Sequence, residues 1–345
     1  MARSVADHIR VNVTSREEAL LNGARIVNPE AHDAYLRGRY FWNKRTAQGL
    51  TRAVDYFNQA IAIDPKYAQA YSGLADSYAL LGDWEYGALP PNEAFPKAKA
   101  AATKALDLDN NLGEAHASLA FCLDLFDWDW KSAEAQFKRA IVLSPSYATA
   151  HQWYAWHLLV TGRNEGAIRE LTKAEALDPL SLIISADIAD ALLIAHKYDE
   201  SMRQSRKTIE MDPSFAMAHY QLRQALAQMH KFNEAIPELQ EAIELSRGNP
   251  LCTSHLAYVY AMSGRRHEAT TILEDLKNAS TQRHSNAADI ALIYAGLKEM
   301  DQAFAWLQKA YEDRFNPSIL MRPAFDPLRS DPRFQDLLHR LDLIH

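Results

Sequence analysis

Cysteine is scarce in this chain of 345 residues, and the familiar catalytic motifs are missing. The two cysteines, Cys122 and Cys252, cannot build a disulfide framework or a four-thiolate metal site. Such low usage suits a reducing cytoplasm, where we expect the protein to reside. The sequence contains no glycine-rich phosphate loop, no His-Glu-x-x-His, no Gly-x-Ser-x-Gly and no Cys-x-x-Cys. We therefore expect a protein that is not an enzyme and uses no cofactor or metal.

Positive charge and long apolar runs are also lacking. Lysine and arginine number 37 against 44 aspartate and glutamate residues, which gives a formal net charge of −7. A nucleic-acid binder needs basic patches to replace the counterions of the phosphates, so we expect no nucleic-acid partner. The longest uncharged stretch, residues 140–162, is broken by Pro145 and contains polar side chains, and residues 1–12 carry three charges without an apolar block. We expect neither a spanning helix nor a signal peptide.

A repeat organises what is present. Pro145, Pro179 and Pro213 are separated by 34 residues each, and each follows Ser or Asp and precedes a new apolar segment. Proline ends the preceding helix because it lacks an N–H group and clashes with the turn before it. The spacing therefore predicts helix pairs that recur every 34 residues.

Small residues recur at fixed places within these pairs. They allow two helices to approach closely while large residues fill the gaps between them. One position in the first helix of the unit is small in seven units: Gly38, Ala75, Ala120, Ala155, Ala189, Ala257 and Ala291. Arg223 stands at this position in the sixth unit, where its long side chain must leave the close contact. One hairpin cannot bury both its faces, so we expect stacked hairpins with a continuous core.

These positions and this period resemble the tetratricopeptide repeat over residues 28–314. The resemblance implies an all-α fold, a right-handed α-solenoid of about eight helix hairpins. We expect the pairs to begin near Pro29, Tyr67, Leu112, Tyr147, Leu182, Phe215, Leu251 and Ser285. Residues 1–27 are predicted to be a helix or linker that leads in from an upstream domain. Residues 315–345 are predicted to cap the last hairpin, with an extended stretch followed by an amphipathic helix over residues 333–343.

Both ends carry a finer resemblance. Residues 28–46 (NPEAHDAYLRGRYFWNKRT) and 325–334 (FDPLRSDPRF) are similar to a bacterial subfamily of signalling proteins. In that subfamily such an array forms the C-terminal half, behind a winged-helix, protein-kinase or adenylate-cyclase-like domain, often with a TolB-like segment. The resemblance implies a sensory or docking part of a signalling or transcriptional regulator.

In this architecture the first helices line the concave side, which is the expected binding surface. Projection of their outward positions predicts a peptide-binding groove that is rich in aromatic and acidic side chains. It consists of Asp76, Glu114, Phe121, Asp124, Gln152, Trp153, Trp156, Asp187, Asp190, Tyr220, Gln224, Tyr258 and Met262. Such a groove favours an extended protein segment with basic or apolar side chains, steered by complementary charge. The same positions could instead serve packing between neighbouring helices.

Two other functions stay open at this stage. Asp127 and Asp129 flank Trp128 and could act as acid and base or hold a metal ion, although a loop position beside packed tryptophans is the simpler interpretation. His116, His151 and His219 occupy equivalent positions in three units and are interpreted as a recurring structural position, not as metal ligands. The second of these functions is self-assembly, as a homo-oligomer in which one copy fills the groove of another.

Overall fold

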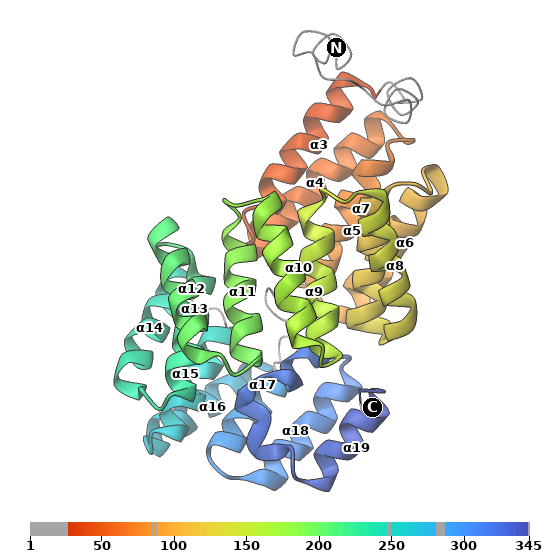
Figure 1. Ribbon diagram of the computed structural model, residues 1–345. Helices are drawn as coiled ribbons and strands as arrows, with labels where there is room; N and C mark the ends of the chain where they lie inside the picture. Colours follow the sequence, from red (N-terminus) through yellow and green to blue (C-terminus); the bar gives the residue numbers. More distant parts are fainter. Residues whose placement is uncertain (1–26, 84–85, 87, 247–249, 281–286, 344–345) are drawn as a thin grey trace.

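The computed structural model describes residues 27–83, 86, 88–246, 250–280 and 287–343. Within these ranges the chain is helical and without strands, and sixteen helices, α3 to α18, form eight successive hairpins (Figure 1). The all-α solenoid expected from the sequence is confirmed. The predicted lead-in helix or linker at residues 1–27 lies almost wholly outside the described residues.

Each repeat unit consists of one first helix and one second helix. The first helices are α3 Pro29–Trp42, α5 Ala68–Gly82, α7 Gly113–Cys122, α9 Ala148–Val160, α11 Leu182–Ile194, α13 Ala216–Gln228, α15 Pro250–Met262 and α17 Ala287–Gly296. The second helices are α4 Ala47–Ile63, α6 Pro91–Leu108, α8 Trp130–Leu143, α10 Asn164–Leu177, α12 Tyr198–Met211, α14 Phe232–Leu245, α16 Arg266–Ser280 and α18 Met300–Glu312.

The helix boundaries follow the prolines. Helices α4, α10 and α12 each end one residue before an aspartate that precedes Pro65, Pro179 or Pro213. The residue before a proline is driven out of the helical conformation, and the aspartates at these three C-caps have extended or near-extended backbone angles. The expected starts of the first six pairs agree with the structure to within one residue. The seventh and eighth pairs begin beside residues that the structure does not describe, and the expected start at Ser285 is one of those residues.

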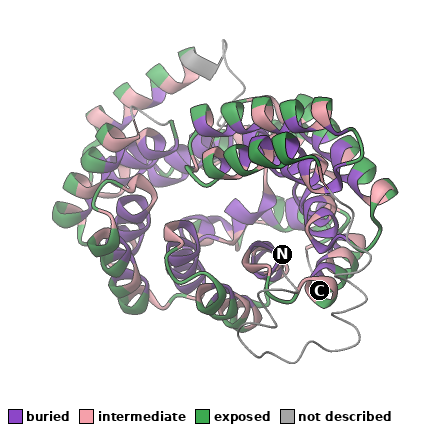
Figure 2. Cartoon of the chain, turned by 90° about the horizontal axis from the view of Figure 1, so that it is seen from above, coloured by how far each residue is buried: buried purple, intermediate pink, exposed green. Residues whose placement is uncertain are grey.

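Close contact explains the small positions. Ala75, Ala120, Ala155 and Ala189 are fully buried. In the first two units the ring of Phe57 lies against two glycines, Gly38 and Gly73, where an added Cβ atom would come within 2.6 and 2.5 Å of it. First helices also contact one another from unit to unit, as α5 does with α7 and α11 with α13. Exposed residues lie mainly along the outer turns when the chain is seen from above (Figure 2).

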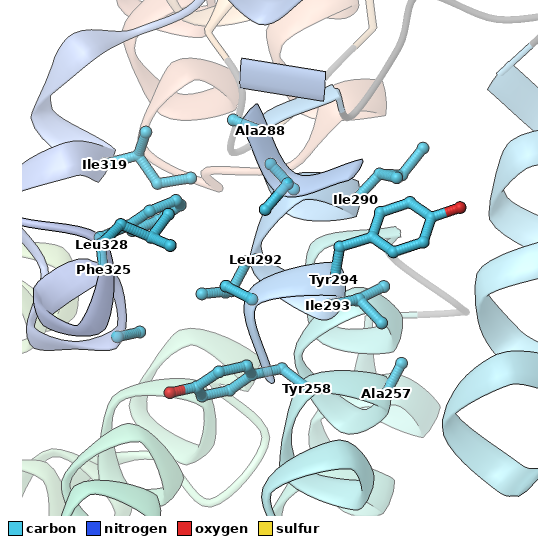
Figure 3. Close-up of a cluster of buried hydrophobic side chains, with 14 of the residues drawn as sticks. Ala257, Tyr258, Ala288, Ile290, Leu292, Ile293, Tyr294, Ile319, Phe325 and Leu328 are labelled. Carbon is cyan, nitrogen blue, oxygen red and sulfur yellow. The ribbon is translucent and has the colours of Figure 1, made fainter. Parts of the chain in front are cut away.

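The C-terminal part caps the solenoid, and its first residues fold back against the concave side. Two 3₁₀ segments, η2 Pro317–Met321 and η3 Pro323–Leu328, precede the short helix α19 Pro332–Arg340. The expected amphipathic capping helix is confirmed, because Phe334, Leu337 and Leu338 are buried. The segment before it was expected to be extended along the last hairpin. Instead its side chains enter the largest apolar core, where Ile319, Phe325 and Leu328 lie beside α17 (Figure 3).

Candidate functional site

Part of the predicted groove is filled by residues 316–328 of the same chain, which form the C-terminal segment. Arg322 donates two hydrogen bonds to the carboxylate of Asp190, at 2.8 and 3.0 Å, and a third to Gln224 at 3.0 Å. Asp190 and Arg322 are 0% and 1% exposed. The guanidinium also lies 6.0 Å from the ring centre of Tyr220. Asp190, Tyr220 and Gln224 therefore recognise an arginine, but one that belongs to this chain.

The C-terminal part, residues 315–343, also contacts the second and third units. Asn316 donates to Asp83 at 3.3 Å. The indole N–H of Trp130 donates to the backbone carbonyl of Leu341 at 2.7 Å, a bond between residues 211 positions apart. Since η2 also packs against α9, the C-terminal part bridges first helices from both halves of the solenoid.

Burial makes this segment a permanent part of the concave side. Leu320, Phe325 and Leu328 are at most 1% exposed. Burying each such side chain contributes about 1.5–3 kcal/mol, so these three alone contribute roughly 5–9 kcal/mol to holding the segment in place. A partner that displaced the segment would have to bury these side chains again with contacts of its own.

A pocket remains between this segment and the middle of the solenoid. It measures about 500 Å³, open solvent at its mouth included. Its lining draws residues from the first five units and from η2 and the residue before it. They are Arg45, Leu80, Asp83, Tyr86, Phe121, Asp124, Leu125, Gln152, Trp153, Trp156, Ile183, Asp187, Asn316 and Ser318. Six of the thirteen predicted groove residues, Phe121, Asp124, Gln152, Trp153, Trp156 and Asp187, are therefore brought together here.

Stacked aromatic rings form one wall of the pocket. The rings of Phe121 and Trp153 are parallel to within 20°, with their centres 4.3 Å apart. Trp42 packs edge-on against Trp153, and the guanidinium of Arg45 lies 3.7 Å from the centre of the Trp42 ring. This wall is rigid because Trp42, Phe121 and Trp153 are all buried.

Two buried carboxyl groups face the aromatic wall. Asp187 accepts hydrogen bonds at Oδ2 from the amide of Gln152 at 2.5 Å and from the indole N–H of Trp156 at 3.3 Å. Burial raises the pKa of Asp187 to about 7, against the opposing effect of the Gln152 hydrogen bond. Asp124 pairs with the ring of His157 at 2.5 Å, and burial raises its pKa as well. The pocket thus combines a desolvated acid with aromatic faces, which suits a cationic or planar group.

The other predicted groove residues lie away from this pocket. Asp76 is bound by Arg39 at 3.2 Å and by Ser118 at 2.6 Å, and burial raises its pKa to about 6. Glu114 is half-buried beside Ser144. Tyr258 packs in the core near Leu292 (Figure 3). Met262 is half-buried against the same core.

Asp127 and Asp129 have structural partners. Asp127 pairs with Lys99 at 2.5 Å, and Asp129 caps the start of α8 by accepting from the backbone N–H of Ser132. Trp128 between them packs on Tyr311 of α18 and on Phe315 of the C-terminal part. Among the described residues no three His, Cys, Asp or Glu side chains gather in a way that could hold a metal ion.

The three equivalent histidines join the parts of their own units. His116, His151 and His219 each bond through Nδ1 to a second-helix side chain, which is Gln136, Glu170 or Glu238. Each also bonds through Nε2 to the carbonyl oxygen six residues earlier, in the turn before the helix. The recurring position is thus a structural clamp within each of these units.

Several site residues escaped sequence reasoning. Arg45, Asn316, Ser318 and Arg322 all come from segments outside the first helices. The one available signal was Arg322 itself, a lone charge between Met321 and Pro323 in an otherwise uncharged stretch from 317 to 325. Arg223 was singled out for its size, and its guanidinium is buried 4.0 Å from the ring centre of Tyr220.

A family model and the solved structures similar to this chain indicate the same repeat. Residues 129–181 match the family model of the tetratricopeptide repeat. Among solved structures, the human IFIT1 dimer with m7Gppp-AAAA has a TM-score of 0.59 at 16% identity, covering 90% of this chain and 78% of that one. The Cut9 and Hcn1 hetero-tetramer of the APC/C has a TM-score of 0.58 at 15% identity, covering 85% and 52%. These likenesses show the fold alone. The fold is therefore that of a tetratricopeptide-repeat solenoid, and residues 129–181 match the repeat itself. Tetratricopeptide repeats generally serve as scaffolds for protein–protein interaction.

Curated relatives match part of the chain. Transcriptional regulator HilA of Salmonella typhimurium (strain LT2) is 30% identical over 145 residues, which are 42% of this chain and 26% of the relative. Putative adenylate cyclase 3 of Rhizobium meliloti (strain 1021) is 29% identical over 126 residues, 36% of this chain and 21% of the relative. The matches thus span about a quarter or less of these relatives' lengths. In the described part of the chain, no helix is both long and apolar enough to cross a membrane.

Proposed function

We propose that this chain is an interaction scaffold that binds an extended protein segment on its concave side, at the pocket between α7, α9 and α11. The single observation that carries the proposal is the pocket itself, where Phe121, Trp153 and Trp156 meet the buried carboxyl of Asp187. Aromatic anchors in partly desolvated pockets dominate the binding energy of many interfaces. The neighbouring part of the concave side is already occupied, because Arg322 of the C-terminal segment is bound there by Asp190 and Gln224.

We further propose that the chain acts as the docking part of a bacterial signalling or transcriptional regulator. The support is the matched portion of two relatives, one named a transcriptional regulator and the other a putative adenylate cyclase. The open reading frame around the coding sequence tests this part: an effector domain encoded in the same frame supports it, and an unrelated gene directly upstream contradicts it.

Selection of peptides on the intact protein tests the binding function. A phage library of random dodecapeptides is selected on the wild type, and the enriched peptides are measured against Trp156→Ala. Trp156 is half-buried at the pocket, so its loss should weaken binding by about 2 kcal/mol, roughly thirtyfold.

Trp306→Ala is the matched control. Trp306 is equally half-buried, but it lies on the second helix α18 of the last hairpin. Both variants must show wild-type helical content and melting temperature. Peptides that bind the wild type and Trp156→Ala equally would place the interface elsewhere and contradict the proposal.

A further inference from the structure

The concave side already contains one complete arginine site. Asp190 of α11 receives two guanidinium N–H groups of Arg322, Gln224 of α13 accepts a third, and the ring of Tyr220 lies beside them. A carboxylate, an amide and an aromatic ring are thus the parts with which this solenoid recognises a guanidinium. The paired N–H groups match the two carboxylate oxygens, which lysine cannot do.

The pocket repeats the same set of parts. Asp187 lies on α11 three residues before Asp190, and its partners Gln152 and Trp156 lie on α9, the preceding first helix. Tyr220 and Gln224 follow Gln152 and Trp156 by 68 residues, two periods of the repeat. At these two positions α9 has an amide and then an aromatic ring, whereas α13 has an aromatic ring and then an amide.

Two polar groups at the pocket still have bonding capacity. Both hydrogen bonds of Asp187 go to Oδ2, and none of the described residues donates to its Oδ1. Ser318, which lines the pocket from the C-terminal segment, is 2% exposed, and its hydroxyl has no hydrogen-bond partner in the part of the chain that the structure describes. A buried polar atom without a partner is unfavourable, so a bound group that supplies the missing hydrogen bond gains affinity from it.

Acidic side chains outnumber basic ones at the pocket, where Asp83, Asp124 and Asp187 line it with the single guanidinium of Arg45. Asp124 is already paired with His157, so Asp187 is the carboxyl that a cation would meet, and it is ionised above its pKa of about 7. Arg45 is engaged on the face of Trp42, 3.7 Å from its ring centre. The half-buried ring of Trp156 adds attraction for a planar cation.

We propose that the pocket binds the guanidinium of an arginine side chain presented by the partner segment, with Asp187 and Ser318 as its ligands and Trp156 as its stacking face. The inference rests on the proposed function, since it names the partner's chemistry at the same site. The pair of Asp190 and Arg322 is an example, within the same molecule, of how such a carboxyl binds an arginine.

Blocked amino acids test this proposal on the full chain. The probes are N-acetyl amides of arginine, citrulline, lysine and glutamate, titrated while the seven indole N–H resonances are followed by NMR. The Trp156 resonance, assigned by its loss in Trp156→Phe, reports on Asp187 because this indole donates to Oδ2. The arginine amide should shift it saturably, and citrulline, which keeps the shape without the charge, should bind at least tenfold more weakly.

Variants separate a specific site from weak surface attraction. Asp187→Asn should weaken binding of the arginine amide at least tenfold, while Asp199→Asn, at an exposed position of α12, should leave it unchanged. Equal binding of citrulline or glutamate amide, or an arginine response without saturation or without dependence on Asp187, would overturn the inference. Selected dodecapeptides that require Trp156 but contain no arginine would overturn it too, and would leave the proposed function standing.

Discussion

Replacement of Arg322 by alanine is expected to destabilise the protein by about 3–5 kcal/mol. The change leaves Asp190 as an unpaired charge at 0% exposure, and breaking a buried ion pair on one side costs this much. The C-terminal segment that carries Arg322 should loosen as well. Urea denaturation followed by circular dichroism measures the loss as a lower midpoint.

Two further variants show whether the charge is the cause. Arg333→Ala removes an arginine whose pairs with Asp301 and Asp331 are solvent-accessible, and it should cost no more than about 1 kcal/mol. The double variant Asp190→Leu, Arg322→Met replaces the buried pair by apolar groups and should recover most of the stability. If Arg322→Ala were no more destabilising than Arg333→Ala, the buried pair would not hold the segment in place.

Replacement of Asp187 by asparagine is expected to stabilise the protein increasingly as the pH rises. Burial raises the pKa of Asp187 to about 7, whereas an aspartate in an unfolded chain has a pKa of about 3.9. Between these values the folded chain holds a proton that the unfolded chain has released, so wild-type stability falls with rising pH. Asparagine does not titrate. At about 1.36 kcal/mol per pKa unit, the advantage of the variant should grow by about 2–3 kcal/mol from pH 5 to pH 8.

Denaturation of both proteins at each pH measures this difference. Asp76 and Asp289 also have raised pKa values, but they titrate alike in the wild type and the variant, so they cancel in the comparison. Asp199→Asn should show no such trend, because its carboxyl is exposed. A constant difference between the wild type and Asp187→Asn across this range would mean that Asp187 is ionised in the folded chain throughout. A stabilising substitution at the candidate site would fit a carboxyl kept for binding at a cost in stability.

The repeat architecture could be predicted because its determinants are local. Prolines after Asp64, Asp178 and Asp212 end helices through the backbone of the preceding residue, and the buried alanines recur with a fixed period. Such signals need no knowledge of the rest of the chain. The capping helix followed for the same reason, since Phe334, Leu337 and Leu338 form one apolar face within a single helix.

The state of the concave side could not be predicted in the same way. The thirteen residues were projected from helix geometry alone, which says where a side chain points but not what lies opposite. Arg322 is 132 residues from Asp190 and 98 from Gln224, and no repeat pattern links them. The inward turn of η2 and η3 depends on apolar burial against α17, a long-range contact. The projection therefore placed Asp187 and Asp190 in one groove. It could not tell that Asp187 lines a pocket and that Asp190 is bound by Arg322.

Hydrogen exchange with a selected dodecapeptide would test most directly whether the partner binds on the concave side at this pocket. Exchange along the whole chain is compared with and without the peptide. Binding at the pocket should slow exchange in α9, in α11 and in residues 316–322, and leave the second helices α10 and α12 unchanged. Protection confined to second helices would place the partner on the outer surface, and protection confined to the last hairpin would place it far from the pocket; either result would contradict the proposed function.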